Sequence, residues 1–195
     1  SHWISISGGI EEWWGYPTIR KLNIFLENLE PMDLEESYKN QRLAEAKFLR
    51  AFCYFNMVKR YGGVPLITRS QQLDESDDEL YPSRDNEATV YDFIISELND
   101  ISVHLPETVG GANAGRASKY AALALKSRAA MYAASIATWG DVALEGIVGI
   151  PQTRANQYWQ ASYDASREII ENGPFSLYNV HEDKVANFRN LFLDE

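Results

Sequence analysis

The segment from Ala44 to Thr68, AEAKFLRAFCYFNMVKRYGGVPLIT, is the feature that most constrains the fold. Leu49, Cys53 and Met57 recur every four residues, and a row of phenylalanines lies beside them. A helix that is apolar on most of its sides has to be buried between several neighbours. We therefore predict that a helix over residues 40–61 is the centre of the core.

The end of this helix is marked by a Gly62-Gly63 pair and by a proline two residues further on. Glycine permits positive φ, and the residue before a proline is pushed into an extended shape, so the chain turns here and leaves the helix. Two charges interrupt the apolar helix, Glu45 and Arg50. They are five residues apart and do not face each other, so we expect each to pair with a different neighbouring element.

Four further segments show helical spacing of apolar residues and end at proline or glycine signals. Strand patterns of similar strength are missing, and we expect only short extended pieces, at 64–67 and 175–178. Many alanines mixed with Tyr, Leu and Trp let neighbouring helices approach closely, as in tetratricopeptide-like helix pairs, although no strict 34-residue period aligns. The prediction is an all-α, tetratricopeptide-like helical-repeat scaffold with long loops. The four segments are 13–29, 85–104, 116–136 and 155–172.

Composition limits the partners. The 195 residues carry a net charge of −10 and have no basic stripe, which argues against nucleic acid as a partner. The 45% hydrophobic content is enough for a core, and no apolar run is long enough to span a membrane. The single cysteine, Cys53, lies inside the apolar helix and is expected to pack as a small core residue.

The motifs of catalysis and metal binding do not occur. The three histidines follow no metal-ligand spacing, and the acidic run at 74–79 lacks the glycine and the final glutamate of a calcium loop. The glycine-rich stretch at 110–115 lacks the Lys-Ser/Thr ending of a phosphate loop. The adjacent pair Glu11-Glu12 is not placed across a cleft, as a glycosidase would require. We expect no catalytic residue, metal or cofactor.

The stretch AEAKFLRAFCYFNMVKRYGGVPLIT resembles the signature helix and turn of the SusD/RagB family. Further segments resemble this family in the correct order, and YPTIRKLNIFLENL fits the helix that carries the family's asparagine, here Asn23. The remaining segments are SRDNEATVYDFIISELNDISVHLPE, GRASKYAALALKSRAAMYAAS, ASYDASREIIENGPFSLYN and NFRNLFLDE.

The resemblance implies a non-catalytic, surface-exposed outer-membrane lipoprotein that binds glycans or other nutrients. It also implies a partner, a SusC-like TonB-dependent transporter that receives the oligosaccharide. Family members are usually much longer. We therefore expect residues 1–195 to form one partial SusD-like domain, with the N-terminal anchor region, including its lipid-anchor cysteine, and the C-terminal portion outside this chain.

Flat aromatic side chains stack on the apolar faces of sugar rings, so exposed tryptophans are the candidate ligand-binding residues. Trp3 and the pair Trp13-Trp14 precede the first packed helix, in a region comparable to that of the family's ligand-binding tryptophans. Adjacent residues on a helix point about 100° apart, so the pair cannot be buried in one direction. The alternative for each is simple packing of the helix start. Trp139, on a loop, is a further candidate.

Polar contacts to a ligand are expected from Arg20 and Asn23 on the first helix, although Asn23 alternatively serves a buried hydrogen bond. Trp159 lies within a helix and is expected in the core. A tetratricopeptide-like adaptor that binds a protein partner is the alternative function. A peptide groove lined with Asn and Lys would favour the adaptor, whereas an exposed tryptophan platform would favour the glycan binder.

Overall fold

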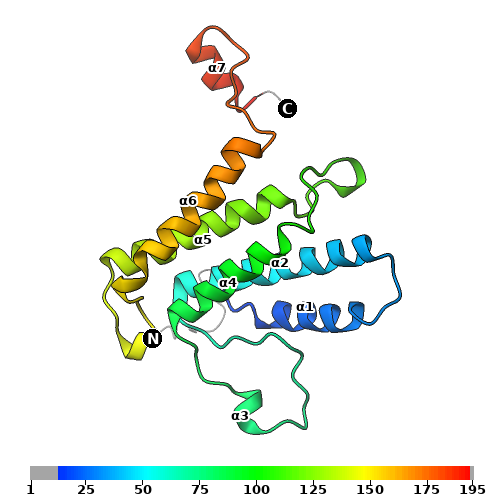
Figure 1. Cartoon of the computed structure of the whole chain (residues 1–195), viewed down its shortest axis with the longest axis vertical. Helices are drawn as coiled ribbons and strands as arrows, with labels where there is room; N and C mark the ends of the chain where they lie inside the picture. Colours follow the sequence, from blue (N-terminus) through cyan, green and yellow to red (C-terminus); the bar gives the residue numbers. More distant parts are fainter. Residues whose placement is uncertain (1–12, 194–195) are drawn as a thin grey trace, which may run out of the picture.

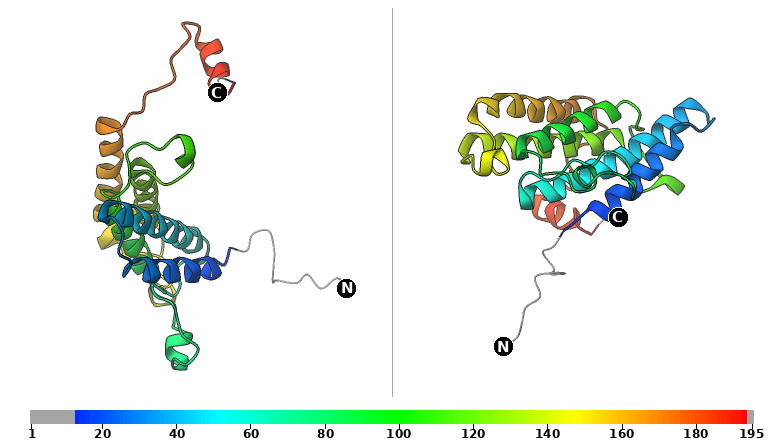
Figure 2. Two further views of the ribbon diagram at one scale, coloured as in Figure 1. Left: turned by 90° about the vertical axis from the view of Figure 1, so that its right-hand side faces the viewer. Right: turned by 90° about the horizontal axis from the view of Figure 1, so that it is seen from below.

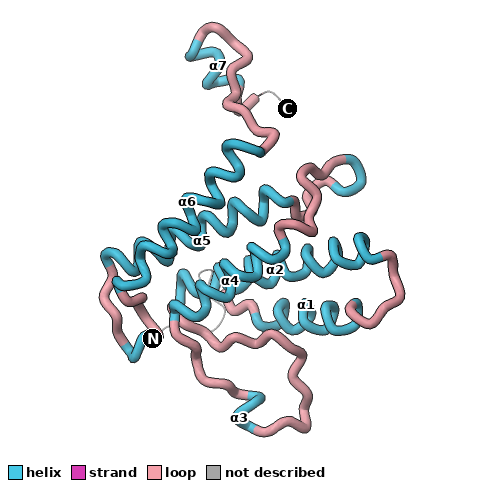
Figure 3. The backbone as a smooth tube through the Cα atoms, in the orientation of Figure 1, coloured by secondary structure: helices cyan, strands magenta, loops and turns pink. Residues whose placement is uncertain are grey.

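The computed structural model describes residues 13–193 and is built from α-helices joined by long loops (Figure 3). Within these residues no β-strand occurs, and one isolated bridge joins Ala143 to Val148. The expected extended pieces at 64–67 and 175–178 therefore do not form strands. The long helices are α1 (Tyr16–Leu29), α2 (Glu36–Tyr61), α4 (Glu87–Ile101), α5 (Lys119–Trp139) and α6 (Ala155–Asn172); the short ones are α3 (Asp77–Leu80), α7 (Lys184–Asn190) and three 3₁₀ turns, η1 (Gly111–Asn113), η2 (Leu144–Gly146) and η3 (Gln152–Arg154).

The long helices pack in sequence order, α1 on α2, α2 on α4, α4 on α5 and α5 on α6. Figures 1 and 2 show the resulting layered array, with α3 on a loop at one side and α7 standing away from the helical body. This arrangement confirms the all-α prediction with packed helix pairs. None of the helices within residues 13–193 combines the length and apolar character needed to cross a membrane.

Helix α2 is the centre of the core, as the sequence predicts. It contacts α1, α4 and α5, and its Tyr54, Phe55 and Met57 side chains are at most 1% exposed. Burial of side chains of this size contributes about 1.5–3 kcal/mol each. The expectation that the helix is buried on most sides is wrong along one strip, where Leu49 and Phe52 remain 49% and 43% exposed.

Several helix ends differ from the sequence prediction. Helix α2 begins four residues before the expected residue 40, because the Glu35 carboxylate accepts the N–H groups of Ser37 and Tyr38 at 2.9 Å. Helix α4 begins at Glu87, two residues later than expected, because the carboxylate of Asp85 instead accepts the Leu66 N–H at 2.8 Å. Helix α5 covers 119–139 instead of 116–136, and α6 has the expected bounds.

The Gly62-Gly63 turn brings three distant segments together. Gly62 has φ 71°, and the Gly63 N–H donates to the Ile147 carbonyl at 2.6 Å. A Cβ atom on Gly63 would lie 1.8 Å from the Asp85 carbonyl oxygen, so only glycine fits at this crossing. The turn therefore fixes both the start of α4 and the loop after α5 against the end of α2.

The two charges inside α2 pair with different elements, as expected. The Arg50 guanidinium forms two hydrogen bonds with the Glu97 carboxylate on α4, one of them from Nε at 3.1 Å. Glu45 pairs with Arg116, which precedes α5, and with Arg42 on its own helix at 2.8 Å. Burial raises the pKa of Glu97, and the hydrogen bonds from Arg50 oppose that rise.

Candidate functional site

A groove of about 340 Å³ lies where the start of α1 faces the chain that leaves the Gly62-Gly63 turn. One wall comes from residues 14–20 and the other from residues 67–71, so two segments about 50 residues apart build it. Aromatic and aliphatic groups dominate the lining, and two guanidinium groups stand among them. The lining residues are Trp14, Tyr16, Pro17, Ile19, Arg20, Ile67, Arg69 and Gln71.

Trp14 is the exposed aromatic group of this groove. Its side chain is 53% exposed, although the ring is held edge-to-face by Tyr16 at 5.0 Å and by Tyr61 at 5.5 Å between ring centroids. The side chain of Trp13 is 41% exposed, and its backbone N–H donates to the Tyr61 hydroxyl at 3.0 Å. Both side chains are thus partly exposed, but the helical argument for this expectation is wrong, because α1 begins at Tyr16 instead of residue 13 and the pair precedes it. A ring fixed by its neighbours loses little freedom when a ligand stacks on it.

Close packing onto α2 positions the Trp13-Trp14 segment. The N–H of Gly15, which follows the pair, lies 3.4 Å from the Met57 sulfur, and a Cβ there would meet Cys53 and Met57 at contact distance. Tyr16 anchors the next residue, because its hydroxyl donates to the Pro65 carbonyl at 2.7 Å. Burial raises the pKa of Tyr16 above its ordinary range, so this hydroxyl stays protonated as a donor.

The polar rim of the groove carries two cations in different states. Arg20 is exposed and donates from Nη1 to the Gln71 carbonyl at 2.6 Å, and within residues 13–193 no carboxylate forms an ion pair with it. Arg69 is paired with Glu75 at 2.5 Å and lies 3.9 Å from Glu79. Arg20 therefore has donors left for a ligand, whereas the charge of Arg69 is neutralised.

Asn23 is fully buried behind the groove. It forms buried hydrogen bonds, which was the alternative to a ligand contact. Its Nδ2 donates to the carbonyls of Ile67 and Arg69, both at 2.9 Å, and its Oδ1 accepts from Arg50 at 2.8 Å. The expectation of a direct ligand contact does not fit this position, because the amide is already bonded on both sides. Asn23 instead holds the 67–69 wall of the groove in place.

Trp139 does not line this groove. It is the last residue of α5 and does not lie on a loop as expected; its side chain is 72% exposed and its ring packs edge-to-face with Trp159 at 6.0 Å. The Trp159 ring N–H donates to the Thr138 hydroxyl at 3.1 Å, and the side chain is 36% exposed, so the expectation of a core position for Trp159 is wrong. Trp3 lies outside the described residues.

The structure thus brings together Trp14 and Arg20 from the predicted set, with Trp13 beside them. Sequence reasoning missed Tyr16, Arg69 and Gln71. The Gly-Gly-Val-Pro turn indicates that the following chain is extended, but nothing in the pattern shows which helix it runs along.

The chemistry available in the groove is that of binding. Its lining offers an indole face, aliphatic groups, guanidinium donors and an amide, and none of the eight residues is a carboxylic acid, thiol or imidazole. Within residues 13–193, no group of three or more His, Cys, Asp or Glu side chains is arranged to hold a metal ion. A stacked ring with hydrogen-bonding groups at its edge fits this surface.

Comparison with known proteins defines the class. Residues 10–131 match the SusD-like family described as "Starch-binding associating with outer membrane". The chain therefore belongs to the SusD/RagB family of SusD-like proteins. It is similar to SusD-like proteins P25 and P38 of Formosa agariphila, with 29% and 34% identity, each over 92% of this chain and 29% of the relative.

Solved structures agree with this assignment. A SusD-like protein from Bacteroides fragilis is 33% identical, with a TM-score of 0.59 over 77% of this chain and 26% of its own. A structure described as a laminarin-binding SusD-like protein is 25% identical, with a TM-score of 0.61 over 80% of this chain and 29% of its own. The chain spans less than a third of these relatives, and its helices have the tetratricopeptide-like fold of SusD-like proteins.

Proposed function

We propose that this chain belongs to a non-catalytic nutrient-binding protein that captures oligosaccharide in the groove beside Trp14. The observation that carries the proposal is the half-exposed Trp14 ring, fixed by Tyr16 and Tyr61, in a groove that Arg20 also lines. The indole would stack on the apolar face of a sugar ring, and Arg20 would donate to its hydroxyl groups. The family description and the laminarin-binding relative support a carbohydrate ligand.

The family description supports a proposal for the wider setting. We propose that the full-length protein is lipid-anchored, lies at the cell surface on the outer membrane, and passes the oligosaccharide to a SusC-like TonB-dependent transporter. Residues 1–195 would then be one part of a longer SusD-like domain, which fits the share of the relatives' length that the chain spans. The outer-membrane description of the family supports this setting.

The test is isothermal titration of the chain with neutral and acidic oligosaccharides, including laminarin fragments. Trp14→Ala is expected to reduce affinity at least tenfold, because stacking on an aromatic ring and burial of its face are lost. Arg20→Ala is expected to weaken binding less. Trp139→Ala is the matched tryptophan variant outside the groove and is expected to leave the affinity unchanged. Loss of binding with Trp139→Ala and retention with Trp14→Ala would move the site to the end of α5.

The adaptor alternative has one observation in its favour, since Asn99 and Lys126 stand together in a groove between helices. A polypeptide ligand would be expected to bind there without involving Trp14. Titration with acidic and neutral peptides, in parallel with the sugars, separates the two functions.

A further inference from the structure

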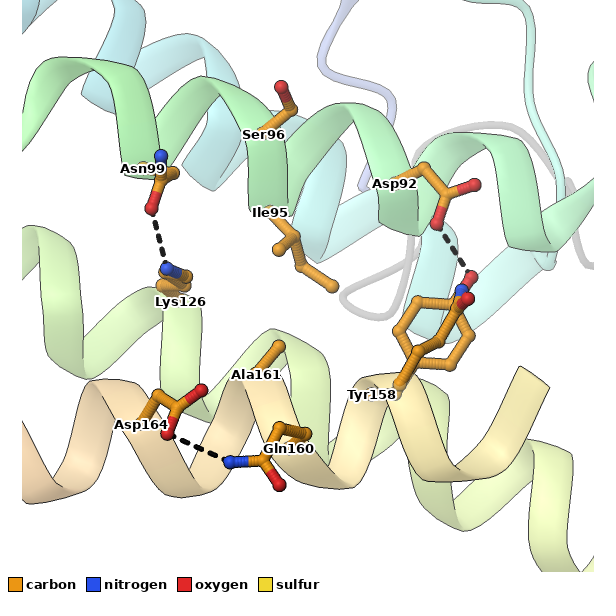
Figure 4. A pocket seen from close by; sticks show the side chains of 10 residues that line it. Asp92, Ile95, Ser96, Asn99, Lys126, Tyr158, Gln160, Ala161 and Asp164 are labelled. Atoms are coloured by element: carbon orange, nitrogen blue, oxygen red, sulfur yellow. Dashed lines mark hydrogen bonds between the residues drawn. The ribbon is translucent and has the colours of Figure 1, made fainter.

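A second and larger groove, of about 530 Å³, lies between α4 and α6. Figure 4 shows it from close by, with Ile95 of α4 and Ala161 of α6 pointing toward each other across its middle. Polar side chains occupy both ends, and Lys126 enters from α5. None of these residues belongs to the groove beside Trp14.

Lys126 is a cation with spare hydrogen-bonding capacity. Its Nζ donates to Asn99 Oδ1 at 2.7 Å, and within the described residues no carboxylate lies within 4 Å of it. An ammonium group has three donors, so two remain for a ligand. Burial lowers the pKa of Lys126, and the charges of Asp164 and Asp100 oppose that change from a longer distance.

Asp164 supplies the complementary acceptor at the same end of the groove. It accepts from Gln160 Nε2 at 2.9 Å, and Figure 4 shows it on α6 on the same side as Lys126. A carboxylate has about four lone-pair sites, so it can accept further bonds. Lys126 and Asp164 thus frame a space that suits a group able to accept from one and donate to the other, as a hydroxyl does.

At the opposite end of the groove, the charged group Asp92 already has hydrogen-bond partners. Asp92 accepts two hydrogen bonds from Arg154 Nη2, at 2.8 and 2.7 Å, and one from the Tyr158 hydroxyl at 2.7 Å. Asp92 and Asn99 are seven residues apart on α4, which corresponds to about 10 Å at a rise of 1.5 Å per residue. This length suits a short oligosaccharide.

Charge selects among ligands. A carboxylate group would pair with Lys126 but would also face Asp164, within a chain whose net charge is −10. A neutral ligand rich in hydroxyl groups meets neither penalty. We infer that the groove between α4 and α6 is a second carbohydrate subsite, which binds a neutral sugar through hydroxyl bonds to Lys126, Asn99 and Asp164. This inference rests on the proposed sugar-binding function but not on Trp14.

The experiment is nuclear magnetic resonance of the ¹⁵N-labelled chain titrated with laminarin and malto-oligosaccharides at about 10 mM, tenfold above a ~1 mM dissociation constant. Backbone and side-chain amide signals of Ser96, Asn99 and Gln160 report on the groove. Lys126→Met is expected to raise the dissociation constant obtained from these signals about tenfold or more, because a hydrogen bond to a charged group is lost. Asp164→Asn is a second variant that preserves size.

Two controls make the result specific. Arg128→Met removes an exposed cation two residues further along α5 that does not line the groove, and it is expected to have no effect. Trp14→Ala is expected to leave the groove signals responsive. Response of the Trp14 groove alone overturns this inference and leaves the proposed function standing. If only the groove between α4 and α6 responds, this inference stands and the assignment of sugar binding to the Trp14 groove is overturned.

Three other outcomes also overturn the inference. They are an undiminished response in both the Lys126→Met and Asp164→Asn variants, tighter binding of galacturonate oligosaccharides than of neutral sugars, and binding of peptides but of no sugar in this groove. Silence of both grooves toward every sugar would reject the inference and the proposed function together.

Discussion

Arg50 on α2 donates from Nη1 to Oδ1 of Asn23 on α1, at 2.8 Å, in a fully buried setting. The other two guanidinium nitrogens, Nε and Nη2, donate to the Glu97 carboxylate on α4, and Asn23 Nδ2 donates to the carbonyls of Ile67 and Arg69. One polar pair therefore connects three elements and the wall of the Trp14 groove. A buried polar group that loses its partner costs about 1–3 kcal/mol, so each member depends on the other.

Asn23→Ala is expected to lower the free energy of unfolding by about 2–3 kcal/mol. The substitution removes the partner of the Arg69 carbonyl and of one guanidinium N–H in the core, and it leaves the Ile67 carbonyl with its bond from Tyr54 alone. Urea unfolding followed by circular dichroism measures the change. Asn28→Ala, on the exposed side of the same helix, is expected to stay within about 0.5 kcal/mol. Equal effects of the two substitutions would show that the Asn23 bonds contribute nothing net.

Two buried tyrosines are expected to respond oppositely to loss of their hydroxyl groups. The Tyr54 hydroxyl accepts the Ile67 N–H at 2.7 Å and donates to the Ile67 carbonyl at 3.0 Å. The Tyr91 hydroxyl is buried and has no hydrogen-bond partner within residues 13–193. Tyr54→Phe should therefore destabilise the chain by about 1–2 kcal/mol, and Tyr91→Phe should leave it unchanged or up to about 1 kcal/mol more stable.

Thermal and urea unfolding of both phenylalanine variants, together with the parent chain, tests this contrast. The two substitutions remove the same atom from side chains that are both fully buried, so differences in packing are small. A loss of stability in Tyr91→Phe as large as that in Tyr54→Phe would reveal a partner for the Tyr91 hydroxyl.

Gly63→Ala is expected to destabilise the chain by about 3 kcal/mol or more, because the added Cβ would meet the Asp85 carbonyl oxygen at 1.8 Å. Backbone would have to move where the end of α2, the start of α4 and the loop after α5 meet. Gly110→Ala is the matched control. That glycine has φ −162° and open space around it, so alanine should be neutral or up to about 1 kcal/mol stabilising. Denaturation midpoints of the two variants give the comparison.

Glu87 is expected to make stability fall as pH rises. It is 5% exposed and accepts the Gly149 N–H at 2.6 Å, and burial raises its pKa above the ordinary 4.5, while that hydrogen bond opposes the rise. The folded chain then holds a proton that the unfolded chain has released. The contribution of Glu87 is therefore fully present below about pH 4.5 and is lost as pH rises through the folded pKa.

Glu87→Gln removes this titration while keeping an acceptor for Gly149. The variant is expected to gain stability relative to the parent chain as pH increases through that window, as measured by urea unfolding at several pH values. Glu168→Gln is the control of opposite sign. Hydrogen bonds from Lys119 and Asn172 lower the pKa of Glu168, so its contribution is present at neutral pH and lost on acidification. Parallel curves for the parent and the Glu87→Gln variant would contradict a raised pKa.

The spacing of apolar residues and the glycine and proline positions predicted much of the fold. The apolar periodicity of residues 40–61 placed α2 at the centre, and the Gly62-Gly63 pair marked its end, because burial and backbone conformation depend directly on residue type. The exact ends of the helices were harder to predict from the sequence. The start of α2 depends on capping by Glu35, an unusual capping residue, and the start of α4 shifts because Asp85 bonds to a distant segment.

The sequence by itself determined the family, the all-α class, the central helix and the aromatic character of the candidate site, because these follow from residue types and their spacing. Only the tertiary structure decided which residues act together. It buried Asn23 behind Ile67 and Arg69, placed Trp14 beside Arg20, separated Trp139 from both, and brought Lys126 between α4 and α6. Such groupings arise from contacts between segments tens of residues apart, whose packing no local periodicity records.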